Sequence, residues 1–206
     1  MYDRQTDTLW HQIWATPAFG PLAGSGIKLK RLPVTLTTWK AWYTRHPDTK
    51  VMAFNTGFTR DYRVGAAYRE YFDSPDTMFP VWRRSDLLPT KSWVFTLLID
   101  GRPKAYPLPS IEKQRIINDT LAGQNLVVIH DNGGHGARAY ERRQHRFALT
   151  AKDTTTEILD EEGRKWRVAE DALLSPGVEK LARLPGHMAF WFGWFSFYPQ
   201  TEVFGR

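Results

Sequence analysis

The sequence predicts a β-rich α+β protein built from two duplicated modules, the first incomplete, each ending in an aromatic helix. Residues 29–51 match residues 181–203 without a gap at a constant offset of 152, with identical residues at nine of 23 positions. A match of this kind indicates an internal duplication. Between the two copies, short apolar runs separated by turn residues favour strands. A duplication further predicts that Trp39 and Trp42 lie in surroundings like those of Trp191 and Trp194.

The bulk composition is that of a globular protein. The 206 residues are 42% hydrophobic and 24% charged, which suits one large domain or two small ones. There is no cysteine, so disulfides and thiolate metal sites are excluded. The aromatic run at 186–198 is shorter than the roughly 20 apolar residues of a membrane-spanning helix. We therefore expect no membrane span. The sequence places the protein in the cytoplasm if Met1 is the true start, and outside it if an upstream export signal was lost.

The chain divides into three segments: a partial first module at 1–54, a connecting region at 55–92 and a complete second module at 93–206. In the first module, Leu36, Trp39 and Trp42 recur at helical spacing. Thr37 or Thr38 is placed to cap this helix, and Pro47 ends it. The connecting region is rich in Pro, Gly, Asp and Tyr and has no clear period.

The second module begins with a predicted hairpin, "WVFTLLIDGRPKAYPL", whose turn is Asp100-Gly101. The stretch at 109–119 predicts a short helix capped by Ser110. Strands are then expected at 125–131, 137–142, 146–152, 155–160 and 165–168, with a turn at 160–163.

The end of the chain carries seven aromatic residues in the nine positions from Phe190 to Tyr198. The offset aligns this run with the first-module helix, so it too is predicted to be a helix. Because it is apolar all round, we expect it to lie in the core.

Several long motifs resemble one known family. They are "MYDRQTDTLWHQ", "GPLAG", "LPVTLTTWKAWYTRHPDT" and "GRPKAYPLPSIEKQRIINDTLAGQNLVVIHD". Together they resemble the domain-of-unknown-function family numbered 3179, whose members look like tandems of two related modules. The resemblance implies a further segment, with an AYPL strand and a Y-C-P-L-C-G motif, before the stretch at Met1. It implies no reaction and no catalytic residue.

The loop "HDNGGH" is a candidate metal site. Imidazole and carboxylate groups are good ligands for zinc or iron, so His130, Asp131 and His135 could hold a divalent metal. The competing interpretation is a solvated hairpin tip with incidental histidines. No third histidine or cysteine stands at a recognisable ligand spacing.

A second candidate site lies at the turn between helix and strand, where Asn118 and Asp119 could bind a ligand or simply hydrogen-bond to backbone. Nucleic acid is not an expected partner, because Glu141 and the acidic stretch at 157–162 interrupt the basic residues at 142–146. The sequence favours a non-catalytic binding or structural module for an unknown small ligand or protein partner. The alternative is a metal-binding protein or metal-dependent enzyme that uses the 130–135 loop. An incomplete first module also predicts self-association.

Overall fold

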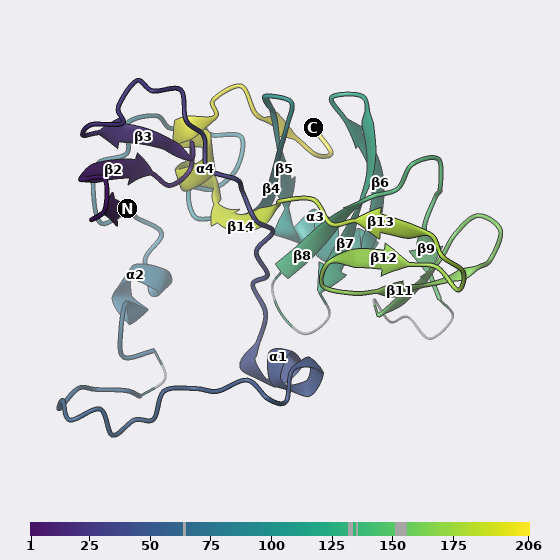
Figure 1. Ribbon diagram of the computed structural model, residues 1–206, viewed down its shortest axis with the longest axis horizontal. Helices are drawn as coiled ribbons and strands as arrows, with labels where there is room; N and C mark the ends of the chain where they lie inside the picture. Colours follow the sequence, from purple (N-terminus) through teal and green to yellow (C-terminus); the bar gives the residue numbers. More distant parts are fainter. Residues whose placement is uncertain (64, 132–133, 135, 151–155) are drawn as a thin grey trace.

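The computed structural model describes residues 1–63, 65–131, 134, 136–150 and 156–206 (Figure 1). Its described part is β-rich with short helices, which confirms the predicted α+β class. The helices are α1 (Trp39–Arg45), α2 (Arg69–Asp73), α3 (Leu108–Gln114) and α4 (Trp191–Phe197). Within the described residues, none of these helices is long and apolar enough to cross a membrane.

The strands form four sheets. One small sheet near the N-terminus contains β1 (Tyr2–Asp3), β2 (Thr8–His11) and β3 (Thr16–Phe19). The second has the order β14 (His187–Phe190), β4 (Trp93–Ile99), β5 (Arg102–Pro107), β15 (Glu202–Val203). The third consists of β6 (Ile116–Leu121), β7 (Gln124–Asp131) and β8 (Gly136–Glu141). The last has the order β13 (Lys180–Ala182), β12 (Ala172–Leu174), β11 (Lys165–Val168), β10 (Glu157–Leu159), β9 (Ala148–Leu149).

The β4–β5 hairpin has the turn that the sequence predicts. Asp100 and Gly101 have φ angles of 45° and 76°, as a two-residue type I′ turn requires at both central positions. Six residue pairs then align from Ile99↔Arg102 to Val94↔Pro107. A second turn of the same kind, Ala122-Gly123, joins β6 to β7.

The region at 109–119 differs from its prediction. Helix α3 begins at Leu108, its N-cap is Pro107, and no side chain caps it, so the predicted Ser110 cap is wrong. Pro109 lies in the first turn, where its missing N–H costs no hydrogen bond. The helix ends at Gln114, and Arg115 with φ 64° turns the chain into β6. Ile117 and Leu121 then join the core as strand residues.

Among the described residues, all buried hydrophobic side chains except Ala15 lie in 93–206. The sheets of this part are packed through three groups of buried side chains, which include Phe95 and Ile111 in one, Tyr140 and Trp166 in another, and Trp191 in the third. Helix α4 buries Trp191 and Trp194 against β4 and β5, while Phe192 remains half-buried. The aromatic run is therefore a helix with one face in the core.

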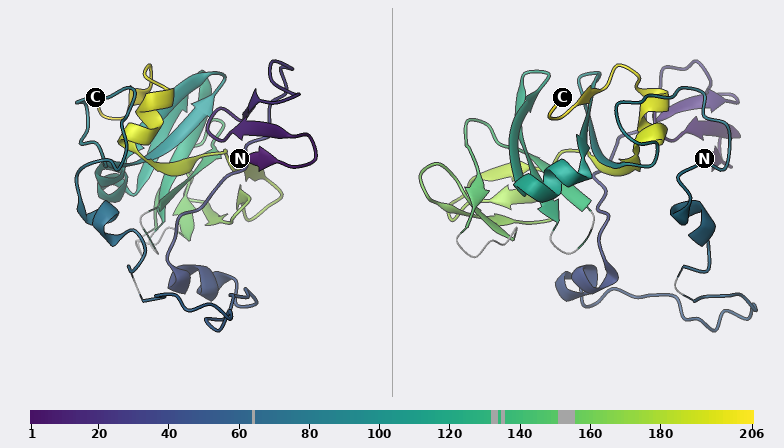
Figure 2. Two further views of the ribbon diagram at one scale, coloured as in Figure 1. Left: turned by 90° about the vertical axis from the view of Figure 1, so that its left-hand side faces the viewer. Right: turned by 180° about the vertical axis from the view of Figure 1, so that it is seen from behind.

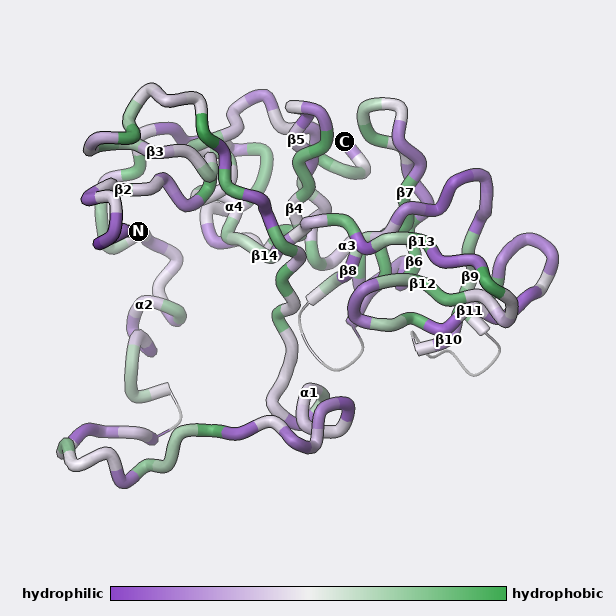
Figure 3. The backbone as a smooth tube through the Cα atoms, viewed as in Figure 1, coloured by the Kyte–Doolittle hydropathy of each residue, from purple (hydrophilic) through white to green (hydrophobic). Residues whose placement is uncertain are grey.

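The first 92 residues are packed very differently. Helix α1 and the chain that follows it lie away from the sheets in both views (Figure 2). No residue of α1 is buried, and Trp39 is 53% exposed. Hydrophobic residues recur along this trace (Figure 3), including Val51 and Phe54, which are 69% and 76% exposed. Apolar side chains of this region thus lie in solvent.

The environments of the matched tryptophans do not agree with the predicted duplication. Trp39 is 53% exposed where Trp191 is 1% exposed, so the two helices lie in unlike environments. Trp14, which the offset pairs with Trp166, is 48% exposed where Trp166 is fully buried. The predicted duplication is therefore not confirmed by the packing, and the division at residues 54 and 92 stays a prediction.

The two helix units nevertheless share their backbone and their internal contacts. Both helices have seven residues, and their C-caps, His46 and Tyr198, have φ/ψ angles of −133°/69° and −130°/69°. Trp42 Nε1 donates to Thr49 Oγ1 at 3.0 Å. Trp194 Nε1 donates to Thr201 Oγ1 at 2.9 Å. Thr38 caps α1 by accepting from the backbone N–H of Ala41, as predicted.

Candidate functional site

The segment that precedes α1 runs against the loop that the sequence singles out as a metal site. A Cβ added to Gly136 would collide with the carbonyl oxygen of Leu36, and one on Gly134 would lie 2.9 Å from the Cα of Thr37. Only glycine therefore permits this approach of the two backbones. Gly134 and Gly136 therefore allow the segment that precedes α1 to lie directly against this part of the β7–β8 connection.

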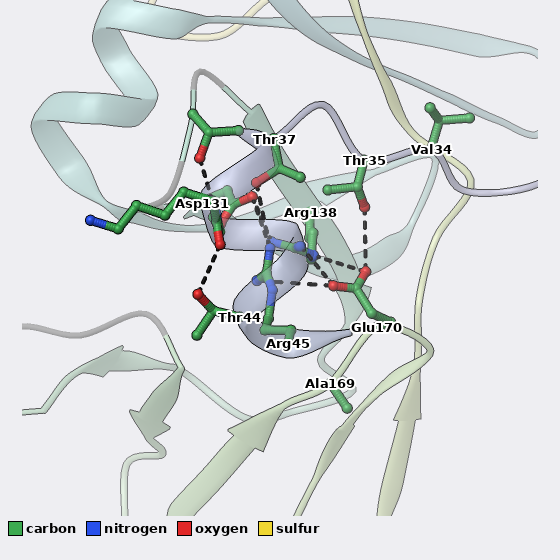
Figure 4. Close-up of polar contacts among 12 residues, drawn as sticks. Val34, Thr35, Thr37, Thr44, Arg45, Asp131, Arg138, Ala169 and Glu170 are labelled. Atoms are coloured by element: carbon green, nitrogen blue, oxygen red, sulfur yellow. Dashed lines mark hydrogen bonds and ion pairs between the residues drawn. The ribbon is translucent and has the colours of Figure 1, made fainter. Parts of the chain in front are cut away.

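A cluster of charged side chains holds this junction together (Figure 4). Arg138, on β8, lies 3.2 Å from Asp131 through Nη1 and 2.8 Å from Glu170 through Nη2. Its Nε also donates to Glu170 at 3.3 Å. The side chains of Arg138 and Asp131 are each only 5% exposed. Because a charge this deeply buried is costly unless it is paired, Arg138 and its two carboxylates stabilise one another.

Arg183 links these charged side chains to the segment that precedes α1. Its Nη1 lies 2.9 Å from Glu170 Oε2, and its Nη2 donates to Thr35 Oγ1 at 2.7 Å and to the carbonyl oxygen of Val34 at 3.3 Å. Arg45, from α1, approaches Asp131 at 3.6 Å. We call Arg45, Asp131, Arg138, Glu170 and Arg183 the junction cluster.

The electrostatics of the junction cluster keep its carboxylates ionised. Burial by itself raises the pKa of Asp131, but the guanidinium of Arg138, a hydrogen bond from Thr37 and the charge of Arg45 lower it overall. Burial likewise opposes ionisation of Glu170, and its bonds to Arg138 and the charge of Arg183 lower its pKa. Three guanidinium groups face two carboxylates, so the cluster is suited to holding segments together and not to donating or accepting protons near pH 7.

A second cluster joins the motif residues of the second module. Asp119 accepts from Tyr106 Oη at 2.9 Å and lies 2.7 Å from Lys104 Nζ. Burial raises the pKa of Asp119, but the bonds from Lys104, the backbone N–H of Thr120 and Tyr106 lower it overall. The pKa of Tyr106 is raised by burial and then by the nearby Asp119. Tyr106 is therefore a neutral hydrogen-bond donor in a buried site.

Asn118 has a structural contact across the sheets. Its Nδ2 donates to the carbonyl oxygen of Phe147 at 2.8 Å, and its Oδ1 accepts from the backbone N–H of Phe147 at 2.8 Å. The amide thus bonds to both backbone groups of one residue 29 positions away. This pairing fixes the chain that leads into β9. A ligand-binding role for Asn118 and Asp119 stays a prediction.

The predicted metal ligands are only partly described. His130 and Asp131 are the last two residues of β7, and successive strand residues point to opposite faces. His135 lies outside the described residues. In the described ranges, no group of three or more His, Asp or Glu residues is placed to hold a metal ion. The site at His130, Asp131 and His135 therefore stays a prediction.

Sequence patterns do not mark Arg138, Glu170 or Arg183 as site residues. One signal was present for Arg183, because Arg31 and Arg183 are an identical pair in the repeat. Arg31 also reaches the C-terminal part of the chain, since its Nη2 donates to Tyr198 Oη at 3.1 Å as well as to the carbonyl oxygen of Ile13 at 2.8 Å. Arg138 had a weaker signal as a charge between the alanines of a predicted strand.

Comparison with known protein families matches residues 1–201 to the family described as "Protein of unknown function (DUF3179)". No curated protein and no solved structure matches the chain. The family match therefore assigns no activity to the chain.

Proposed function

The chain belongs to the DUF3179 family, and we propose that it is a non-catalytic module that binds another protein through its first 92 residues. The second module serves as the folded scaffold, and the first module and connecting region present the binding surface. This proposal extends the prediction from the sequence by choosing a protein partner over a small ligand.

One observation carries the proposal: large hydrophobic side chains are distributed very unevenly. Among the described residues, 24 large hydrophobic residues are exposed, and 23 of them lie in 1–92; the other is Val178. Conversely, 28 of the 29 buried hydrophobic residues lie in 93–206; the other is Ala15. A large amount of exposed apolar surface is typical of interaction sites, because removing it from water is favourable.

The polar clusters support a role without catalysis. The carboxylates of Asp119, Asp131 and Glu170 are each bound to a lysine or an arginine, and each has a pKa below its usual value. A general acid or base works best with a pKa near the operating pH, which means a raised pKa for a carboxyl group. These groups are better suited to fixing segments than to transferring protons.

A photo-crosslinking residue at position 39 tests the proposal, with the same residue at Val178 as the matched control. Both positions are exposed, but only position 39 lies in the proposed surface. We expect position 39 to form a crosslink to one defined protein, with the contact located by mass spectrometry, and position 178 to form none. Equal crosslinking at the two positions would contradict the proposal. Sedimentation velocity separates a foreign partner from self-association.

Metal analysis tests the competing function. A stoichiometric divalent metal in the purified protein, lost in both His130→Ala and His135→Ala variants, would replace the non-catalytic proposal with a metal-dependent one. If both variants keep the metal content and stability of the parent protein, the metal alternative is eliminated.

A further inference from the structure

The α4 unit (residues 181–203) shows how the matching α1 unit (residues 29–51) can be covered. In the second module, β14 pairs antiparallel with β4, from His187↔Thr96 to Phe190↔Trp93. After the helix, β15 pairs in parallel with β5 through Glu202↔Lys104 and Val203↔Ala105. The β4–β5 hairpin therefore receives the strand before the helix on one edge and the strand after it on the other. Both tryptophans of α4 are buried beneath this hairpin.

The α1 unit has the same parts without such a hairpin. The offset of 152 places residues 35–38 where β14 lies and residues 50–51 where β15 lies. In the described part of the chain, neither stretch belongs to a strand. Leu36, Trp39 and Val51 are 41%, 53% and 69% exposed. These are the side chains that a hairpin in the equivalent place would cover.

Resting on the proposed function, we propose that the partner covers α1 with a β-hairpin of its own, paired antiparallel with residues 35–38 and parallel with residues 50–51. A second copy of this chain is a poor source. Each copy has two helix units and, among the described residues, one hairpin of this kind, which already covers α4. If one copy donated this hairpin to another, its own Trp191 and Trp194 would become exposed. The pair of molecules would then bury no additional apolar surface.

Charge identifies one requirement for the hairpin. Glu202 pairs with Arg102 at 2.8 Å and lies 3.9 Å from Lys104. The position 152 residues earlier is Lys50, which reverses the charge. A hairpin that docks on the α1 unit therefore carries acidic side chains where β5 carries Arg102 and Lys104, since like charges across paired strands are destabilising.

Size gives a second requirement. A Cβ on Gly186 would collide with the ring of Phe95, and the residue 152 positions before Gly186 is Val34. The partner hairpin must therefore carry a small residue where β4 carries Phe95, because a phenylalanine there would overlap the valine side chain. The two requirements together distinguish the partner from the chain's own hairpin.

Two synthetic hairpins test the proposal. The first has the sequence of residues 93–107 with Phe95→Ala, Arg102→Glu and Lys104→Glu; the second has the unchanged sequence. Each is added as a free peptide and also fused ahead of Met1 through a flexible linker, which raises its effective concentration to about millimolar. Hydrogen exchange at residues 35–38 and 50–51 measures docking.

We expect the acidic hairpin to slow exchange in both stretches and to bind about tenfold more tightly than the unchanged one. Lys50→Glu should remove that preference and favour a hairpin carrying Phe95→Ala alone. Trp39→Ser should weaken docking of every version. Absence of protection even in the fused acidic form would overturn the proposal, as would equal protection by the two hairpins or a dimer that buries this face. The crosslink at position 39 could still form in those cases, so the wider proposed function would survive.

Discussion

Helices α1 and α4 have nearly the same local structure but lie in different surroundings. Their lengths and their C-cap angles agree, and each links a tryptophan to a threonine seven residues later. Yet α4 buries two tryptophans and α1 buries no residue. The comparison separates two causes of structure. Local sequence is enough to form the helix and its internal hydrogen bond, whereas burial depends on strands contributed by distant parts of the chain.

The largest expected effect comes from truncating the first tryptophan of each helix. Trp191→Ala should lower the free energy of unfolding by about 3–5 kcal/mol, because it removes a buried ring and leaves a cavity. Trp39→Ala should change it by about 0.5 kcal/mol or less, since that ring is half in solvent. Urea unfolding at constant m-value measures both. Equal losses of unfolding free energy in the two variants would contradict the difference in burial between the two helices.

The junction cluster allows a second comparison, between buried and exposed ion pairs. Arg138→Gln should destabilise the protein by about 3 kcal/mol or more, because Asp131 loses its nearest positive charge inside the protein. Asp171→Asn is the control, since Asp171 and Lys180 are 70% and 57% exposed and such pairs contribute about 1 kcal/mol or less. Thermal unfolding of the two variants measures the loss of stability in each. A loss from Asp171→Asn as large as that from Arg138→Gln would contradict it.

Acid should produce a smaller effect, in which Asp160 takes part. Burial raises the pKa of Asp160, but hydrogen bonds from Trp166, Arg164 and backbone N–H groups lower it to about 2. A carboxyl whose pKa is depressed by folding stabilises the native state above its unfolded pKa of 3.8. That contribution is lost as the pH falls from about 4 to about 2.

Unfolding curves at several pH values check this effect. Asp160→Asn should flatten the dependence of stability on pH in that window. Asp61→Asn is the control, because Asp61 pairs with Arg63 on the exposed surface of the connecting region. If the slope between pH 4 and 2 survives in Asp160→Asn, other carboxylates must account for it.

Sequence patterns predicted the parts of the fold that local rules determine. The β-rich class, the Asp100-Gly101 hairpin, a cap by Thr37 or Thr38 (observed at Thr38) and the aromatic helix follow from turn chemistry, capping and periodicity. The boundary at α3 was missed because Ile116 and Ile117 continue an apolar pattern that suits a helix or a strand, and only pairing with β7 decides between them.

The candidate site was harder to predict than the fold. Asp131 was selected for its chemistry as a metal ligand, and its observed partner, Arg138, lies on the neighbouring strand. Asn118 was selected for a turn, and its partner is Phe147, 29 residues away. Side-chain partners on different strands depend on which strands pair and in which register, and these are fixed by the assembled sheet and its turns and not by one segment alone.

The contacts of Arg183 have a consequence for how the molecule fluctuates. Its Nη1 donates to Glu170, and its Nη2 donates to Val34 and Thr35. Nearly all buried hydrophobic side chains lie in 93–206, so Val34 and Thr35 can detach while the sheets persist. Loss of the sheets, by contrast, also removes the contacts of Val34 and Thr35 with Arg183. Thermal motion should therefore release this segment before it opens the sheets.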